Sequence, residues 1–140
     1  MPADGKIAAL RTVGLFSGCT ERELSDIARL STKVEVEAGT VLTSQGEPGA
    51  ECFVIAEGEA EVVIDGKVVA RSGAGDTVGE MSLLDGGHRT ATVRAATPMT
   101  LYVLSSAEFR AMLATSPTIS LKIMYALAAR LRNLEASPLH

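Results

Sequence analysis

The segment from Val78 to Val93 (VGEMSLLDGGHRTATV) combines the charged and small residues that an anion site needs. If residues 89–95 form a strand, Arg89 points to the same side as the apolar Ala91 and Val93. A guanidinium turned toward a protein interior keeps its charge, so its burial is costly unless an anion pairs with it. We therefore expect Arg89 to pair with either an internal carboxylate or a negatively charged ligand.

Residues 80–84 follow Gly79 and are expected to form one helical turn. Free backbone N–H groups at the start of such a turn attract an anion, and a buried arginine facing them suits one phosphate. Glu80 is the nearest candidate carboxylate for Arg89, and its role has two interpretations. Glu80 forms a structural ion pair with Arg89, or it accepts hydrogen bonds from a sugar hydroxyl while Arg89 holds a phosphate. The second arrangement would indicate a nucleotide.

An alternation of apolar and polar residues with a period of two indicates many short strands around this segment. The expected strands cover residues 33–37, 41–42, 52–56, 60–64, 67–71, 89–95 and 99–104. Asp65-Gly66, between two of them, is typical of a two-residue hairpin loop. Short strands separated by glycine-rich turns predict a sandwich or a barrel-like roll.

Helices are expected before and after the strands. Residues 6–13 could form a short amphipathic helix, and Thr20 and Glu23 have the spacing of a capping box that starts a second one. Ser105-x-x-Glu108 repeats this pattern after the last strand. Ser116-Pro117 is then typical of the N-cap and first residue of a longer helix that reaches about Glu135.

The chain of 140 residues shows no internal repeat and no linker, so we predict a single domain over residues 1–140. Its fold class is α+β and mainly β. The predicted parts are N-terminal helices in 1–31, a β-roll in 32–104 and C-terminal helices in 105–136.

Residues 79–84 (GEMSLL), followed after a short loop by residues 89–93 (RTATV), resemble the phosphate-binding cassette of cyclic nucleotide-binding domains. This family is the sensor module of catabolite activator proteins, cyclic-nucleotide-dependent kinases and cyclic-nucleotide-gated channels. The resemblance covers nearly the whole chain, since the turn glycines Gly39, Gly46 and Gly58 also match. It implies an eight-stranded, jelly-roll-like β-roll with the cassette in 78–93, and cAMP or cGMP as the ligand.

The resemblance also implies a role for each residue of the cassette. Arg89 would bind the exocyclic oxygens of the cyclic phosphate, and Thr90 would add a hydroxyl to the same group. Glu80 would bind the ribose 2′-hydroxyl. Backbone N–H groups near Met81 and Ser82 would complete the anion site.

Apolar residues would face the base by the same resemblance, namely Val62, Val69 and Val78. For Val62 and Val69 the alternative is a place in the ordinary core of the roll. Gly79 would allow close approach of the backbone to the ligand, or would be a turn glycine. In the activator proteins polar residues late in the last helix contact adenine, and the matching positions here look like Leu134 and Glu135. Thr90 is compatible with either base, so the choice between cAMP and cGMP stays open.

The last helix, residues 117–135, is the expected output of the module. Apolar residues recur on it with the 3-4-3 spacing of a coiled-coil seam: Met124, Leu127, Leu131 and Leu134. The seam either joins two copies of the chain in a homodimer, as in activator proteins, or packs on the roll. The basic residues Lys122, Arg130 and Arg132 are expected to form a solvated face.

The resemblance implies a regulatory sensor in which ligand binding favours closure of the last helix over the base. The sequence contains no helix-turn-helix, kinase motif or channel segment. We therefore expect an effector protein of unknown kind as partner, and no nucleic acid bound by this chain alone. Two alternatives remain: the sensor half of a truncated transcription regulator, and an interaction domain of the same fold that binds no nucleotide.

Composition weighs against other classes of function. A net charge of −4 lacks the electrostatics of a nucleic-acid binder. No window reaches the roughly 18 uncharged apolar residues of a membrane span, and the N-terminus lacks the apolar run behind a basic start that is typical of a signal peptide, so a cytoplasmic protein is expected. Two cysteines and two distant histidines do not form a metal set. We therefore expect no metal, no cofactor, no catalytic residues and no cupin-type metal enzyme.

Overall fold

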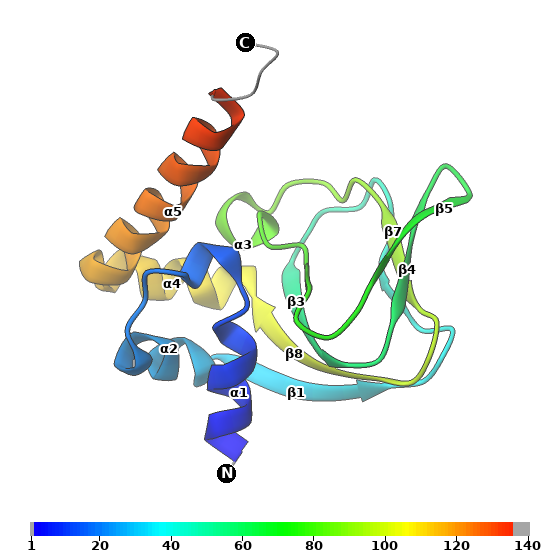
Figure 1. The fold of residues 1–140 in the computed structure, drawn as a ribbon, viewed down its shortest axis with the longest axis horizontal. Coiled ribbons are helices and arrows are strands. Elements are labelled where there is room, and N and C mark those ends of the chain that lie inside the picture. The colour runs from blue at the N-terminus through cyan, green and yellow to red at the C-terminus, as the bar shows by residue number, and fades with distance from the viewer. Residues whose placement is uncertain (1, 136–140) are drawn as a thin grey trace.

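A computed structural model describes residues 2–135 of the chain (Figure 1). Its eight strands form two four-stranded sheets in which every pairing is antiparallel. The first sheet has the order β1 (Ser31–Val36), β8 (Met99–Ser105), β3 (Glu51–Glu57) and β6 (Thr77–Val78). The second has the order β2 (Val41–Thr43), β7 (Thr92–Ala95), β4 (Ala60–Ile64) and β5 (Lys67–Ser72). The predicted mainly-β, eight-stranded fold is confirmed.

Two departures from the predicted strands lie close to the cassette. β6 was not predicted from the pattern, because a strand of two residues is too short to show any alternation. β7 begins at Thr92 rather than at residue 89, since residues 86–91 form a loop whose backbone is hydrogen-bonded to residues 46–49. Burial still alternates in β7 as predicted, with Val93 buried and Arg94 exposed.

The hairpin between β4 and β5 turns at Asp65-Gly66, as predicted. Both residues have positive φ, 51° and 79°, which is the backbone conformation of the type I′ turns that join twisted strands. Gln45 holds the turn from outside, because its side-chain amide donates to Asp65 Oδ1 and its Oε1 accepts from the Asp65 N–H, both at 3.0 Å.

The pairing of β4 with β5 contains a bulge. Val62 lies opposite Ala70 and Val63 lies opposite Val68, so Val69 is an extra residue with no partner across the ladder. Such a bulge breaks the simple inside–outside alternation of the strand. Val69 is accordingly 55% exposed.

Helices cover one end of the roll (Figure 1). They are α1 (Pro2–Leu10), the 3₁₀ turn η1 (Gly14–Phe16), α2 (Glu21–Ala28), α3 (Ser82–Asp85), α4 (Ser106–Thr115) and α5 (Pro117–Glu135). α1 starts before the predicted residue 6, because proline is well accommodated in the first turn of a helix, and it ends at Leu10 rather than at residue 13. The predicted C-terminal limit of the last helix, residue 136, lies outside the described residues.

The predicted starts of α2, α4 and α5 are confirmed. Thr20 and Glu23 form both bonds of the capping box: Thr20 Oγ accepts from the Glu23 N–H at 3.2 Å, and Glu23 Oε1 accepts from the Thr20 N–H at 2.8 Å. Ser105 caps α4, and Pro117 is the first residue of α5.

No single helix in residues 2–135 is long and apolar enough to cross a membrane. α4 and the part of α5 up to Leu134 meet the length and composition of a span only as a pair bent by 113°.

Two apolar cores meet at β3, which is covered on both faces. Phe53 and Ile55 belong to the core between the two sheets, whereas Cys52 and Val54 belong to the core beneath the helices. Leu83 of α3 is fully buried in that helical core. The short helix α3 of the cassette is therefore packed against the helical core and is not part of a loose surface loop.

Candidate functional site

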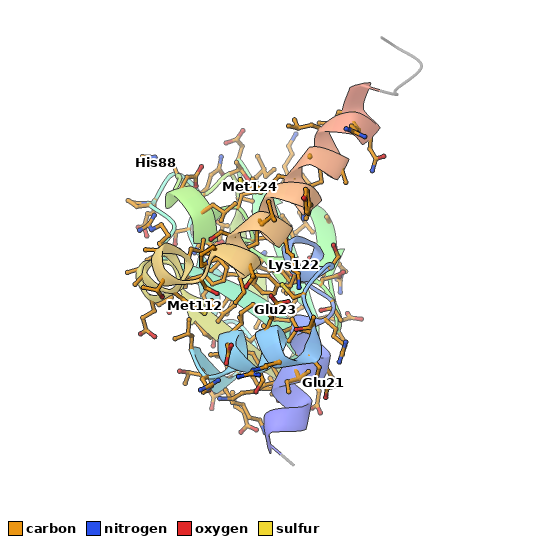
Figure 2. All side chains as sticks on the ribbon, turned by 90° about the vertical axis from the view of Figure 1, so that its left-hand side faces the viewer. Glu21, Glu23, His88, Met112, Lys122 and Met124 are labelled. Atoms are coloured by element: carbon orange, nitrogen blue, oxygen red, sulfur yellow. The ribbon has the colours of Figure 1, made fainter. Side chains whose placement is uncertain are left out.

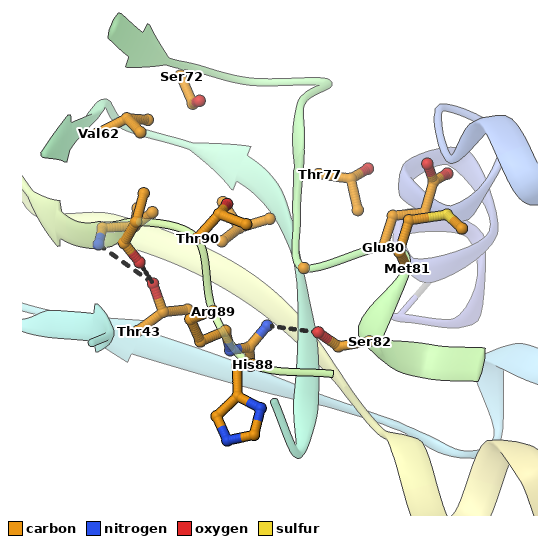
Figure 3. A pocket seen from close by; sticks show the side chains of 14 residues that line it. Thr43, Val62, Ser72, Thr77, Glu80, Met81, Ser82, His88, Arg89 and Thr90 are labelled. Carbon is orange, nitrogen blue, oxygen red and sulfur yellow. Dashed lines mark hydrogen bonds between the residues drawn. The ribbon is translucent and has the colours of Figure 1, made fainter. Parts of the chain in front are cut away.

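A cavity of about 390 Å³ lies between the second sheet and the segment that was predicted to carry the chemistry (Figure 3). Residues 79–82 and 88–91 border it on two sides, and strand residues close it, among them Thr43, Val62 and Val93. The cavity brings together every residue predicted for the site except Val69.

Arg89 is half-buried at the wall of the cavity and is held by neutral acceptors. One terminal nitrogen donates to the carbonyl oxygen of Glu51 at 2.6 Å, and the other donates to Ser82 Oγ at 3.3 Å. Among residues 5–134 no carboxylate lies within 4.0 Å of its guanidinium, although a guanidinium has five N–H donors to place. The positive charge of Arg89 is thus available to an anion in the cavity.

Both the backbone conformation and the space at position 79 require glycine. Its φ is +77°, in the left-handed region that favours glycine. A Cβ at this position would collide with Nη1 of Arg89 and would lie 3.0 Å from the carbonyl oxygen of Glu51. Gly79 therefore serves both as a turn glycine and as the point where the backbone passes close to the guanidinium.

Glu80 does not pair with Arg89, so the structural ion pair considered from the sequence is not formed. The carboxylate points away from Arg89 (Figure 3). Its Oε2 accepts a hydrogen bond from the Leu15 N–H of η1 at 3.0 Å, and its Oε1 pairs with Arg130 of α5. Glu80 thereby connects the cassette to both groups of helices.

This ion pair corrects the prediction of a solvated basic face on α5. Arg130 pairs with Glu80. Lys122 pairs with Glu23 of α2 (Figure 2). Glu80 is 50 residues from Arg130 in the sequence, and Glu23 is 99 residues from Lys122. Nothing in the sequence near Arg130 or Lys122 indicates either partner, because no local pattern encodes contacts over that separation.

The helical turn of the cassette begins two residues later than predicted, at Ser82. The N–H groups of Ser82 and Leu83 donate to the carbonyl oxygens of Gly79 and Glu80 at 3.1 and 3.2 Å. The N–H groups of Glu80 and Met81 have no acceptor among residues 2–135. Of the two predicted amide donors, only that of Met81 is free, while Ser82 contributes its hydroxyl to Arg89.

Side chains around the cavity divide into polar and apolar groups. Thr90 and His88 line it and are exposed. Val62 and Val78 supply its apolar wall. Val69, the bulge residue of β5, lies outside the lining.

Thr43 is a residue of the site that the sequence did not reveal. Its hydroxyl donates to the carbonyl oxygen of Ala91 and accepts from the Val93 N–H, both at 3.1 Å. These bonds replace ladder bonds where the register of β2 and β7 shifts, and they fix the chain directly after Arg89. A lone threonine in a strand of three residues gives no sequence signal for this role.

Cys52 lies behind the site and is fully buried. Burial, with the negative charge of Glu80, raises the pKa of its thiol to about 12, against the opposing effect of Arg89. Its sulfur therefore stays protonated and unreactive at neutral pH. Within the described residues, His, Cys, Asp and Glu form no group of three or more that could hold a metal ion.

Comparison with protein families matches residues 33–116 to the cyclic nucleotide-binding domain. Among solved structures, the N-terminal domain of a transcriptional regulator from Streptomyces coelicolor is 29% identical with a TM-score of 0.81, and the match covers 91% of this chain and 92% of that one. The regulatory domain of Toxoplasma gondii PKA, crystallised with cAMP, is 30% identical with a TM-score of 0.71, covering 78% and 43%.

Curated relatives include a putative potassium channel protein of Rhodopseudomonas palustris, 36% identical over 79% of this chain and 28% of its own length. A cyclic nucleotide-gated potassium channel of Mesorhizobium japonicum is 38% identical over 77% of this chain and 30% of its own length. The chain thus spans less than a third of the length of these relatives. From the match over residues 33–116 and the shared roll, the chain belongs to the cyclic nucleotide-binding domain family.

Proposed function

We propose that this chain is a sensor that binds cAMP or cGMP in the cavity beside Arg89. The observation that carries the proposal is the guanidinium itself, which is half-buried on the cavity wall with no carboxylate partner in the described residues. A cyclic phosphate carries one negative charge on two exocyclic oxygens. Arg89 would bind these oxygens with charge-assisted hydrogen bonds.

Neighbouring donors favour the same position for the phosphate. The N–H groups of Glu80 and Met81 have no acceptor among residues 2–135, and both residues line the cavity. The Thr90 hydroxyl lies on the same lining and is exposed. Gly79 and Ser82 contribute by holding the guanidinium in place, the first by its lack of a side chain and the second by its hydroxyl.

The remaining parts of a nucleotide fit the remaining lining. Glu80 would accept a hydrogen bond from the ribose 2′-hydroxyl after its carboxylate turns from Leu15 toward the cavity. Val62 and Val78 would contact the base. Val69 would join them only if β5 moved inward, since its side chain is 55% exposed.

The output would be a change in the position of α5, transmitted to an effector protein. The seam on α5 supports a homodimer more than packing on the roll, because Met124, Leu131 and Leu134 are all more than half exposed. Leu127 is the member of the seam that packs against the helical core. The cytoplasmic location and the lack of nucleic-acid binding stay predictions from the sequence.

Calorimetric titration of the 140-residue chain with cAMP and, separately, with cGMP tests the proposal. Binding of either nucleotide at one site per chain is expected, together with a rise in melting temperature that grows with ligand concentration. The comparison of the two nucleotides decides the base. No heat with either nucleotide at near-millimolar concentration, and no change in melting temperature, would favour an interaction domain that binds no nucleotide.

A further inference from the structure

The loop that carries Arg89 is bonded along its length to one neighbouring segment, residues 43–49. The Gly46 N–H donates to the carbonyl oxygen of Arg89, and the Arg89 N–H donates to that of Glu47, both at 2.8 Å. Nearer to β7, the Thr43 hydroxyl makes the two bonds drawn in Figure 3. The backbone position of Arg89 is therefore set by residues 43–49.

This segment lies at the edge of the second sheet and needs an anchor of its own. The pairing of β4 with β7 ends at Thr92, so the sheet does not extend to the loop before that residue. β2 likewise ends at Thr43. Beyond these two residues the loop and its neighbouring segment bond to each other, and neither continues as a strand of this sheet.

Gln45 supplies the anchor from the side of β2. Its N–H donates to the Thr92 hydroxyl at 3.0 Å. Because β7 lies between β2 and β4, its side chain passes the end of β7 to reach the β4–β5 hairpin, where the amide makes its two 3.0 Å bonds with Asp65. An amide suits this position, because it offers one acceptor to an N–H group and one donor to a carboxylate.

Resting on the proposed function, we propose that Gln45 is a positioning residue for the phosphate site. Its contact with Asp65 holds residues 44–48 against the tip of the hairpin, and these residues in turn hold the backbone of Arg89. The hairpin also carries Val62 on the cavity wall, so one contact connects the wall that would face the base with the loop that would bind the phosphate. Gln45 does not belong to the lining of this cavity, so it would change the affinity without touching the nucleotide.

The affinity measurement uses four changed forms of the 140-residue chain beside the unchanged one. Gln45→Met keeps the length of the side chain and the charge but makes neither bond. Gln45→Glu still accepts from the Asp65 N–H, but it brings a second carboxylate against that of Asp65. Asp65→Asn keeps both bonds, since asparagine also suits a positive φ before glycine. In the double variant Gln45→Glu/Asp65→Asn the asparagine amide donates to the new carboxylate, which restores both bonds.

Titration with cAMP and with cGMP should give the same order of affinities for whichever nucleotide binds. We expect Gln45→Met and Gln45→Glu to weaken binding by about three- to tenfold, the scale of one net hydrogen bond. Asp65→Asn should bind as tightly as the unchanged chain, and the double variant should recover most of the affinity lost in Gln45→Glu. Because Asp65→Asn removes a negative charge and Gln45→Met removes none, this order separates the contact from an effect of net charge.

Hydrogen exchange without nucleotide follows the loop directly. In Gln45→Met the amides of Gly46 and Arg89 should exchange faster than in the unchanged chain, because the segment that pairs them has lost its anchor. The Gly75 amide is the control, since it donates to the carbonyl oxygen of Ile55 at 2.9 Å in another loop. Its exchange should be equal in both forms, whereas a general loosening of the fold would speed up all three amides.

Each contrary outcome has a distinct meaning. Unchanged affinity in both Gln45→Met and Gln45→Glu would overturn the positioning role, while the sensor function would stand. Three other results would overturn it too: no recovery in the double variant, tighter binding in Asp65→Asn, or weaker binding in Gln45→Met with unchanged exchange at Arg89. No binding by any form, with each shown to be folded by its melting transition, would reject the proposed function itself. The exchange measurement needs no nucleotide, so it would still decide whether Gln45 holds the loop.

Discussion

Gly79 and the guanidinium of Arg89 are packed so closely that no side chain fits between them, and this contact sets the position of the charge in the cavity. We expect Gly79→Ala to weaken nucleotide binding severely, because the new methyl group would push Arg89 away from Ser82 and the carbonyl oxygen of Glu51. The substitution also strains a backbone with φ of +77°, at a cost of about 1–2 kcal/mol in stability. Calorimetry measures the first effect and a melting curve the second.

Gly75→Ala is the matched control for this variant. Gly75 has a φ of +90°, but a Cβ there would meet nothing within 4 Å. Both variants should lose the stability that backbone strain costs, with a further loss in Gly79→Ala from the collision with Arg89, whereas Gly75→Ala should retain its nucleotide affinity. Equal losses of affinity in the two variants would show that backbone strain, not the contact with Arg89, is responsible.

Replacement of Arg89 removes the charge itself. Arg89→Gln is expected to weaken binding by about 1.5–3 kcal/mol, or roughly 10- to 150-fold in Kd, because charge-assisted hydrogen bonds to the phosphate are lost. Arg94→Gln serves as control, since Arg94 lies on the outer face of β7 and pairs with Glu61 at 3.6 Å. Titration of both variants with the preferred nucleotide makes the test, and equal affinities would exclude a phosphate on Arg89.

Features that depend on neighbouring residues were predicted from the sequence. The turn at Asp65-Gly66 and the cap at Thr20 each involve residues no more than three positions apart, so their chemistry is visible in a short window. The inward direction of Arg89 was predicted from the alternation of a strand over 89–95, but β7 begins only at Thr92, so the loop before β7 gives Arg89 its half-buried position. These local rules were enough to predict the turn and the cap, whereas the phosphate-binding role of residues 78–93 came from the family resemblance.

Features that depend on distant parts of the chain could not be predicted in this way. The Glu80–Arg130 pair joins positions 50 residues apart, and Thr43 of β2 bonds to Val93 on the neighbouring strand β7, also 50 residues away in sequence. The bulge at Val69 depends on how β4 and β5 come into register, which alternation within β5 alone does not define. The sequence supplied the residues of the site, but their pairing is a property of the packed fold.

The Lys122–Glu23 pair predicts a pH dependence of stability. The hydrogen bond from Lys122, helped by the Thr20 N–H, lowers the pKa of Glu23 from 4.5 to about 2 in the folded chain. A carboxyl whose pKa is lower when folded stabilises the protein above its unfolded pKa, and that contribution is lost as the pH falls from about 4.5 to about 2. Glu23→Gln should therefore lower the melting temperature at pH 7 and have progressively less effect through this range.

Glu21→Gln is the control for the pH series. Glu21 is in the same helix turn, but its side chain is 76% exposed and lies 3.7 Å from Arg11, an arrangement that contributes little. Its effect on melting should be small at every pH. A loss in Glu23→Gln that persisted unchanged below pH 3 would mean that the pair with Lys122 does not stabilise the fold.

The two cysteines should differ in reactivity. Cys52 is fully buried with a pKa raised to about 12, whereas Cys19 is half-buried with a pKa raised mainly by desolvation. At pH 8 we expect iodoacetamide to modify Cys19 slowly and Cys52 only after denaturant is added. Mass spectrometry of peptides from folded and unfolded protein distinguishes the two, and prompt modification of folded Cys52 would contradict its burial.

Thr43 is expected to matter for both stability and affinity, because its hydroxyl satisfies two backbone groups next to the cavity. Thr43→Val keeps the shape of the side chain but leaves the Val93 N–H and the Ala91 carbonyl without this partner, at a cost of about 1–3 kcal/mol. The loop that carries Arg89 would loosen with it, so nucleotide affinity should fall as well. Thr43→Ser restores the hydroxyl and should recover affinity more fully than stability, since it still lacks the buried methyl group. If Thr43→Val lowers the melting temperature yet binds nucleotide as tightly as the unchanged chain, the hydroxyl supports the sheet alone and the position of Arg89 is set by Gly79 and Ser82.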